Sequence, residues 1–235
     1  MLRKKTIGIL GGMGPEATWD LWGRIIRGTP AGSDADHFHT IVASNPSIPD
    51  RTRAILEEGP SPLPAMIETG MMLQKAGADF LVMPCMTAHH YIEPLASSLD
   101  IPVINAFTLL RRAIQKNLQP DKTVGVIATT GSLRANLYPR YLSEEKLLFP
   151  SPRLQNEVMD IIYGPEGIKA GDGSVLTANR LTELIHWFQR SGSIAVIAGC
   201  TEIGLALYKM KTSLPVIDPL DLLAEEAIHL ALGDG

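Results

Sequence analysis

Residues 4–10, KKTIGIL, recur in altered form at residues 121–127 as DKTVGVI. Two more matching pairs follow in the same order: FLVMPCMT (80–87) with AVIAGCTE (195–202), and IPVINAFTLL (101–110) with LPVIDPLDLL (214–223). The three offsets of 117, 115 and 113 residues are nearly constant, as expected for an internal duplication. The sequence therefore predicts two homologous halves.

Each half alternates short apolar runs with amphipathic segments such as residues 63–78 and 179–193. The runs that we interpret as buried strands are TIGIL (6–10), HTIVAS (39–44), FLVMP (80–84), PVIN (102–105), TVGVIA (123–128), AVIAG (195–199) and PVID (215–218). This alternation is typical of βαβ units with parallel sheets, so we predict an α/β fold. We expect the first domain to span residues 1–100 and 214–235, and the second to span residues 101–213.

The composition excludes several classes of protein. The chain has 235 residues, a net charge of −4, 45% hydrophobic residues and 20% charged residues, with Lys and Arg scattered along it. This distribution argues against a nucleic-acid groove, and no apolar run approaches the roughly 18 residues of a membrane span. The TIGIL run is too short for a signal-peptide core, and two cysteines make no disulfide framework. We expect a reduced cytoplasmic protein with no nucleic-acid or membrane partner.

The two cysteines, Cys85 and Cys200, fall at equivalent places in the two halves, just after predicted strands. Each is followed within two residues by a threonine, Thr87 or Thr201. Ligands of open α/β sheets bind at this edge, so thiols from halves that face each other would point at one cleft. A lone cysteine is more often a small buried hydrophobe, but the paired placement favours a functional role.

Three kinds of chemistry use a pair of cysteines. A disulfide relay usually has its cysteines in a C-x-x-C motif, whereas these are 115 residues apart. A zinc site needs further ligands, and only His89 and His90 lie near a cysteine in sequence, so we predict no metal. Inversion at a carbon atom fits best, because one thiolate can remove a proton from one face while the opposite thiol delivers one to the other.

Five motifs in order resemble the aspartate/glutamate racemase family, in particular its cofactor-independent aspartate racemases: GILGGMGPEAT (8–18), NPSIPDRT (45–52), PCMTAHH (84–90), IKAG (168–171) and GCTEIG (199–204). The resemblance covers essentially the whole chain. It implies two Rossmann-like α/β/α domains related by pseudo-two-fold symmetry, with the active site in the cleft between them. It also implies catalytic Cys85 and Cys200, no pyridoxal phosphate or other cofactor, an acidic amino acid as substrate, and a homodimer.

The same resemblance implies roles for the other motif residues. Arg51 and Lys169 would hold the distal carboxylate of the substrate. The residues expected to hold its α-carboxylate and amino group are the loop amides near Met13, with Thr87, Thr130 and Thr201. From proximity in sequence, we expect His89 to favour the thiolate of Cys85 and Glu202 to keep Cys200 protonated.

Two features leave alternatives open. The segment that contains Gly12, Gly14 and Ala17 also matches a dinucleotide-binding fingerprint, but the next strand ends in Ser-Asn rather than in an acidic residue. Met86 stands where the family has an asparagine, and methionine cannot donate hydrogen bonds to a substrate. The alternatives are therefore a related cysteine enzyme (a decarboxylase, hydantoin racemase or maleate isomerase) or a catalytically weakened protein that binds acidic ligands.

Overall fold

The computed structural model describes residues 4–119, 121–171 and 175–233. The chain forms two compact units, one of residues 1–106 with 220–235 and the other of residues 107–219. The chain passes between the units at the starts of two helices, α5 (Ala106–Asn117) and α11 (Pro219–Leu232). Among the described residues, no helix is long and apolar enough to cross a membrane.

The unit boundaries differ from those predicted at residues 100 and 213. Val103 forms an isolated parallel bridge with Leu81 of the first unit, and strand β7 (Val216–Ile217) pairs with β6 (Ser193–Ala198) of the second. The predicted strand at residues 102–105 is thus reduced to a single bridge at Val103, whereas the predicted strand at 215–218 forms β7. In each half the chain crosses to the other unit only at the helix that follows. The repeat shows that the segments 101–110 and 214–223 are equivalent, but it does not show which sheet each one joins.

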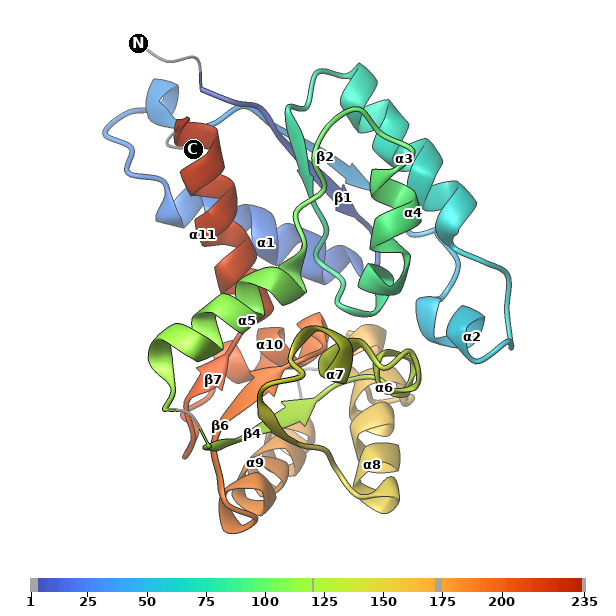
Figure 1. The fold of residues 1–235 in the computed structure, drawn as a ribbon, viewed down its shortest axis with the longest axis vertical. Helices are drawn as coiled ribbons and strands as arrows, with labels where there is room; N and C mark the ends of the chain where they lie inside the picture. Colours follow the sequence, from blue (N-terminus) through green and yellow to red (C-terminus); the bar gives the residue numbers. More distant parts are fainter. Residues whose placement is uncertain (1–3, 120, 172–174, 234–235) are drawn as a thin grey trace. The chain divides into compact units, whose positions relative to one another are not determined.

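The first unit has a parallel sheet, as predicted, and its strand order is β2-β1-β3. Its strands are β1 (Ile7–Gly11), β2 (Thr40–Ser44) and β3 (Phe80–Val82). The central strand β1 is buried throughout, which explains why its sequence is apolar without alternation. Figure 1 shows α1 and α11 on one side of this sheet and α3 and α4 on the other.

The helices of the first unit are α1 (Pro15–Gly28), α2 (Arg51–Ile55), α3 (Leu63–Lys75) and α4 (Ile92–Ala96), with the short 3₁₀ helices η1 (Asp34–Asp36) and η2 (Thr87–Tyr91). Helices α1 and α11 are joined by buried Arg24, whose guanidinium binds Asp20 at 2.6 Å and Asp221 at 2.8 Å. The Arg24–Asp221 ion pair thus holds α11, from the C-terminal part of the chain, against α1 of the first unit.

The second unit has a parallel sheet with strand order β5-β4-β6-β7. Its strands are β4 (Thr123–Ile127), β5 (Lys146–Leu148), β6 (Ser193–Ala198) and β7. Strand β5 was not predicted, because its three residues lie at the sheet edge and are only partly buried. With Val103 counted beside β3, the order of pairing matches that of the first unit, which confirms the predicted pair of α/β halves.

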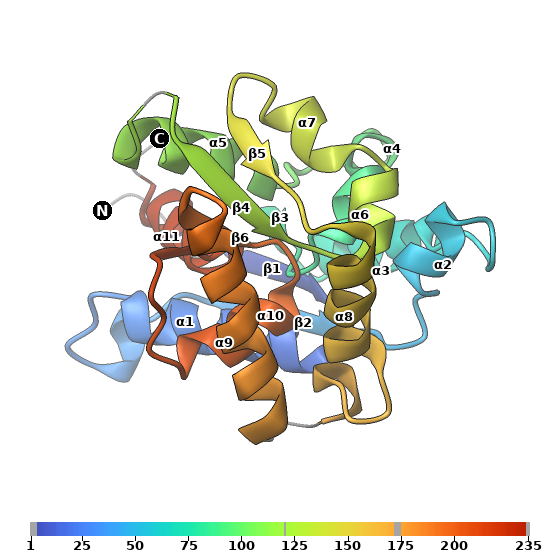
Figure 2. The same cartoon turned by 90° about the horizontal axis from the view of Figure 1, so that it is seen from below.

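The helices of the second unit are α6 (Thr130–Arg134), α7 (Leu137–Tyr141), α8 (Pro152–Tyr163), α9 (Val175–Arg190) and α10 (Thr201–Tyr208), with the 3₁₀ helix η3 (Ile168–Ala170). Figures 1 and 2 show α8 and α9 on one side of strands β4 and β6, with α5 and α7 on the other. Phe107 of α5 stacks on Tyr141 of α7, with ring centroids 5.0 Å apart, so these two helices pack together on their side of the sheet.

Candidate active site

Cys85 lies in a tight turn just after strand β3. Its backbone N–H donates to the carbonyl of Met83 at 2.9 Å, and its side chain packs in the core of the first unit with Leu10, Met13 and Ala88. Only 6% of the residue is exposed. The thiol is therefore held by the sheet edge and the loop after β1, at the position expected from the repeat.

His89 is completely buried and ties the Cys85 turn to the start of α5. Its Nδ1 lies 2.9 Å from the carbonyl oxygen of Cys85, and its Nε2 accepts the N–H of Ala106 at 3.1 Å. A ring that donates from Nδ1 and accepts at Nε2 is the neutral tautomer. Burial lowers the pKa of His89 from 6.5 to about 4, although its backbone hydrogen bonds oppose the shift. The expected cationic role is therefore wrong: at neutral pH His89 is uncharged and cannot favour a thiolate by its charge.

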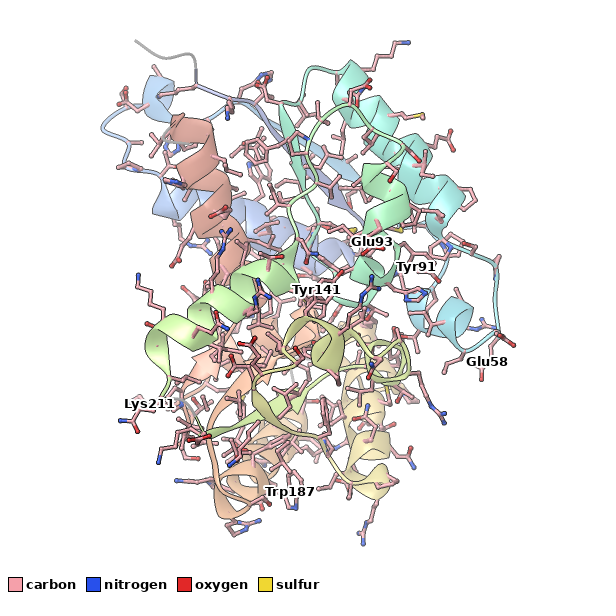
Figure 3. The ribbon with its side chains drawn as sticks, viewed as in Figure 1. Glu58, Tyr91, Glu93, Tyr141, Trp187 and Lys211 are labelled. Carbon is pink, nitrogen blue, oxygen red and sulfur yellow. The ribbon has the colours of Figure 1, made fainter. Side chains whose placement is uncertain are left out.

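Arg51 holds the loop after β1 rather than pointing into open solvent. Its guanidinium donates to the carbonyls of Ile48 at 3.1 Å, Pro49 at 2.9 Å and Met13 at 3.0 Å, and the residue is 7% exposed. Burial raises the pKa of Tyr91, and the positive charge of Arg51 opposes this, so the two side chains lie within electrostatic range. Tyr91, labelled in Figure 3, is the last residue of η2.

The loop after β1, which contains Gly12 and Gly14, is closely packed against the end of β2. Gly12 has a φ of +92°, and a side chain there would come within 2.3 Å of the backbone of Asn45. The amide of Gly12 donates to Thr18 Oγ1 at 2.9 Å, so one amide of this loop is already paired. Met86 and Thr87 follow Cys85 in the chain and are 2% and 6% exposed, so Met86 contributes a buried apolar side chain.

In the second unit, Cys200 immediately precedes α10, at the end of strand β6. Buried Tyr138 donates from its hydroxyl to the carbonyl of Gly199 at 2.8 Å, which fixes the backbone just before the cysteine. A methyl group on Gly199 would lie 2.1 Å from that hydroxyl oxygen, so only glycine fits here. The Cys200 side chain packs in the core of this unit with Ile127, Ala198 and Ile203.

Glu202 connects Cys200 to Lys169. The Cys200 Sγ–H donates to Glu202 Oε2 at 3.0 Å, and the Thr201 hydroxyl donates to the same oxygen at 3.1 Å. The other carboxylate oxygen binds Lys169 Nζ at 2.5 Å, and that ammonium also lies 5.5 Å from the centroid of the Tyr163 ring. Cys200, Thr201, Glu202 and Lys169 thus form one connected network, in which the first three are buried and Lys169 is partly exposed.

This network sets the protonation states of its members. Burial and then the negative charge of Glu202 raise the pKa of the Cys200 thiol well above its usual value, and Lys169 only partly opposes them. Burial alone would raise the pKa of Glu202, but the charge of Lys169 and the hydrogen bonds it receives lower that pKa instead. A position at the start of a helix favours thiolate, so here burial and the carboxylate outweigh the helix. At neutral pH Glu202 is ionised and Cys200 carries its proton.

Thr130, the first residue of α6, follows strand β4, which pairs with β6 through Ile127 and Ala198. Its backbone N–H donates to Met159 Sδ at 3.1 Å, and its hydroxyl oxygen accepts Gln155 Nε2 at 3.2 Å. Both partners come from α8. Thr130 and Cys200 therefore lie at the same edge of the second sheet.

The comparisons with known proteins agree with this arrangement. The family model described as Asp/Glu/Hydantoin racemase matches residues 10–227, which is most of the chain. The chain belongs to this family. As in other members of the racemase family, the fold comprises two parallel-sheet α/β units.

Individual relatives have related names. The broad specificity amino-acid racemase RacX of Bacillus subtilis is 26% identical over 231 residues, covering 96% of this chain and 98% of the relative. The structure of Picrophilus torridus aspartate racemase is 27% identical with a TM-score of 0.86, over 97% of this chain and 94% of that one. An aspartate racemase homologue from Pyrococcus horikoshii has a TM-score of 0.76 at 21% identity, over 97% and 99% of the two chains, and supports the fold alone.

The structure groups the racemase-family residues by unit. Met13, Arg51, Met86, Thr87 and His89 surround the Cys85 turn, while Thr130, Lys169, Thr201 and Glu202 belong to the unit of Cys200. Sequence reasoning missed Tyr138, Gln155 and Met159, which hold the strand-end residues from behind. They lie in no motif and have no equivalent in the repeat, so the sequence offered no signal for them.

Proposed function

We propose that the protein is an amino-acid racemase that uses no cofactor, acts on aspartate or glutamate, and employs Cys85 and Cys200 as its two acid–base groups. The observation that carries the proposal is the thiol of Cys200, which donates to an ionised, buried carboxylate at the end of a parallel strand. A free thiol beside a carboxylate is suited to proton transfer rather than to a disulfide or to packing alone.

The proposed reaction begins with Cys200 protonated and Cys85 as thiolate. Cys85 removes the α-proton of one enantiomer, and the electron pair left on the α-carbon is delocalised into the α-carboxylate. The Cys200 thiol then delivers its proton to the opposite face, which gives the mirror-image amino acid, a Cys85 thiol and a Cys200 thiolate. The reverse direction uses the same groups with their roles exchanged, as general acid–base catalysis requires.

The second unit would supply the remaining binding groups. The Thr130 hydroxyl lies at the same sheet edge as Cys200 and can donate to a substrate carboxylate. Lys169 would exchange its contact with Glu202 for the distal carboxylate. Water-free surroundings strengthen such charge interactions, and both thiols are at least nine-tenths buried.

The test is incubation with L-aspartate or L-glutamate in deuterium oxide, followed by NMR of the α-proton and chiral analysis. We expect exchange together with inversion, without release of carbon dioxide, and no loss of activity after dialysis against a chelator. Cys85→Ser and Cys200→Ser should each abolish inversion, because serine does not form an alkoxide at neutral pH. Full racemisation by either variant would refute the two-base mechanism.

A second candidate is a racemase with broader specificity for amino acids that lack a distal carboxylate. Three observations favour it: Arg51 donates to three backbone carbonyls, Lys169 pairs with Glu202, and a buried apolar Met86 stands where the family has an asparagine. The two cations expected to select an acidic side chain are thus already engaged. The relative RacX carries the description of broad specificity.

The two candidates are separated by substrate preference. The assay is run on both enantiomers of aspartate, glutamate, leucine and methionine at equal concentration. A kcat/KM for the acidic pair that exceeds the apolar pair by tenfold or more supports the first candidate. The opposite order supports the second and leaves the cysteine mechanism unchanged.

A further inference from the structure

We propose that Gln155 is a positioning residue that makes the Thr130 hydroxyl a hydrogen-bond donor toward the substrate. This inference rests on the proposed racemase function, since it assigns Thr130 a substrate group to bind. Gln155 lies on α8, is 8% exposed, and belongs to none of the motifs that indicate the family.

The orientation of the Gln155 amide is fixed by its surroundings. Its Nε2 donates to the carbonyl of Ala128 at 2.9 Å and to Thr130 Oγ1 at 3.2 Å. If the amide were flipped, its oxygen would lie against the carbonyl oxygen of Ala128, where two acceptors cannot bond. One N–H of Gln155 therefore points at the Ala128 carbonyl and the other at Thr130 Oγ1.

This contact decides the direction of the Thr130 hydroxyl. An amide N–H cannot accept a hydrogen bond, so the hydroxyl oxygen is the acceptor and its own hydrogen must point elsewhere. Among the residues that the structure describes, the Thr130 hydroxyl donates no hydrogen bond, and Thr130 is partly exposed. By contrast, the hydrogen of Thr201 is already donated to Glu202.

Neighbouring contacts leave the Thr130 hydroxyl available. The side chain of Thr129 caps α6 by accepting the N–H of Ser132 at 3.2 Å, so Thr130 is not needed as a cap. Met159, one turn after Gln155 on α8, receives the backbone N–H of Thr130. Two side chains from one face of α8 thus hold Thr130 by its backbone and its hydroxyl oxygen.

Gln155 also has a feature that packing does not explain. Its Oε1 is buried and has no hydrogen-bond partner among the described residues. A buried acceptor left unpaired is unfavourable, and a side chain chosen for stability alone would avoid it. We infer that Gln155 serves the donor geometry at Thr130.

The test is a double-mutant cycle on kcat/KM for L-aspartate. Thr130→Val and Gln155→Leu should each lower it about tenfold, the effect of one lost hydrogen bond to a substrate, and the double variant should be no worse than Thr130→Val. Asn156→Leu, at the exposed next position of α8, is the control and should have no effect. Additive losses, near a hundredfold, or an unaffected Gln155→Leu would overturn the inference.

Gln155→Glu changes residue 155 from a hydrogen-bond donor toward Thr130 into an acceptor, while the size of the side chain stays nearly the same. An ionised carboxylate accepts the Thr130 hydrogen, so this variant should be at least as slow as Gln155→Leu at alkaline pH. Its rate relative to the wild type should recover several-fold toward acidic pH, as the introduced carboxyl becomes protonated and can donate. Dividing by the wild-type rate at each pH removes the titration of the Cys200 network, and an unchanged ratio contradicts the inference.

A wild-type protein that does not racemise any amino acid would refute the proposed function before any variant is made. In that case the affinity of the wild type and the same three variants for aspartate is measured by calorimetry. A double variant that binds no more weakly than Thr130→Val supports the role of Gln155. Additive losses of affinity, or no affinity in the wild type, would overturn that role too.

Discussion

Protonation of His89 should destabilise the unit that carries Cys85 at acidic pH. The ring is fully buried, and its Nε2 faces the N–H of Ala106 at 3.1 Å. A proton added to Nε2 would place two donors against each other. Burial accordingly lowers the pKa of His89 from 6.5 to about 4.

The size of the effect follows from linkage. Between pH 6.5 and about 4 the unfolded chain binds a proton that the folded protein resists, so the contribution of His89 is complete above 6.5 and is lost as pH falls through about 4. Each pH unit in that window corresponds to about 1.4 kcal/mol, which gives a total of about 3 kcal/mol. This is a large share of the unfolding free energy of a typical protein domain, which is about 5–15 kcal/mol.

The assay is urea unfolding at a series of pH values, followed by tryptophan fluorescence. Trp19 and Trp22 lie on α1 in the same unit as His89, whereas Trp187 lies on α9, so a Trp187→Phe background reports the relevant unit. In this background His89→Gln should flatten the dependence of the unfolding free energy on pH between 4 and 6.5.

The interpretation depends on the pH slope, because His89→Gln also loses a hydrogen bond. The variant should be less stable than the wild type by about 1–3 kcal/mol above pH 6.5, and this difference should shrink as the pH falls toward 4. His90→Gln is the matched control, since His90 is adjacent but exposed, and it should keep the wild-type slope. A His89→Gln variant whose slope equals that of the wild type would refute the reasoning.

Three further predictions concern the thiols and their support. Burial and then the charge of Glu202 raise the pKa of Cys200, and Glu202→Gln removes that charge. In a protein whose only cysteine is Cys200, thiolate absorbance should therefore develop at lower pH with the Glu202→Gln substitution than without it. Gly199→Ala should cost about 2–4 kcal/mol in urea unfolding through its clash with the Tyr138 hydroxyl, and Tyr138→Phe should recover part of it. Met86→Asn buries an amide and should lower thermal stability, yet raise kcat/KM for aspartate about tenfold relative to leucine; an unchanged ratio would exclude a substrate contact.

The fold was largely accessible from the sequence because central parallel strands are buried on both faces. IGILG of β1 is uniformly apolar and buried, and the equivalent run forms β4 in the second half. Strand β5 was not predicted because its three residues, at the edge of the sheet and only partly buried, do not form a continuous apolar run. The repeat located both cysteines for the same reason, because each is attached to the end of a recognisable strand.

The contacts that the site residues make were harder to predict from the sequence. Glu202 could be linked to Cys200 because they are two residues apart on one helix start, but the contact of Lys169 with Glu202 joins segments 33 residues apart. Arg51 was expected at a substrate, yet its donors reach the carbonyls of its own loop and of Met13. Residue type and motif do not determine which acceptor a guanidinium meets; that depends on how the loops pack.

The duplication repeats the backbone but not the electrostatics around the thiols. Cys200 donates its hydrogen to ionised Glu202, whereas the backbone of Cys85 is bound by His89, which is neutral at pH 7. Two thiols in identical surroundings would rest in the same protonation state, and a two-base racemase needs one proton donor and one acceptor at the start of each turnover. The different residues beside the two cysteines, Glu202 at Cys200 and neutral His89 at Cys85, give the two thiols different surroundings although the backbone is repeated. For the proposed racemase we therefore infer that Glu202 holds Cys200 as the proton donor at the start of turnover, which leaves Cys85 to act as the base.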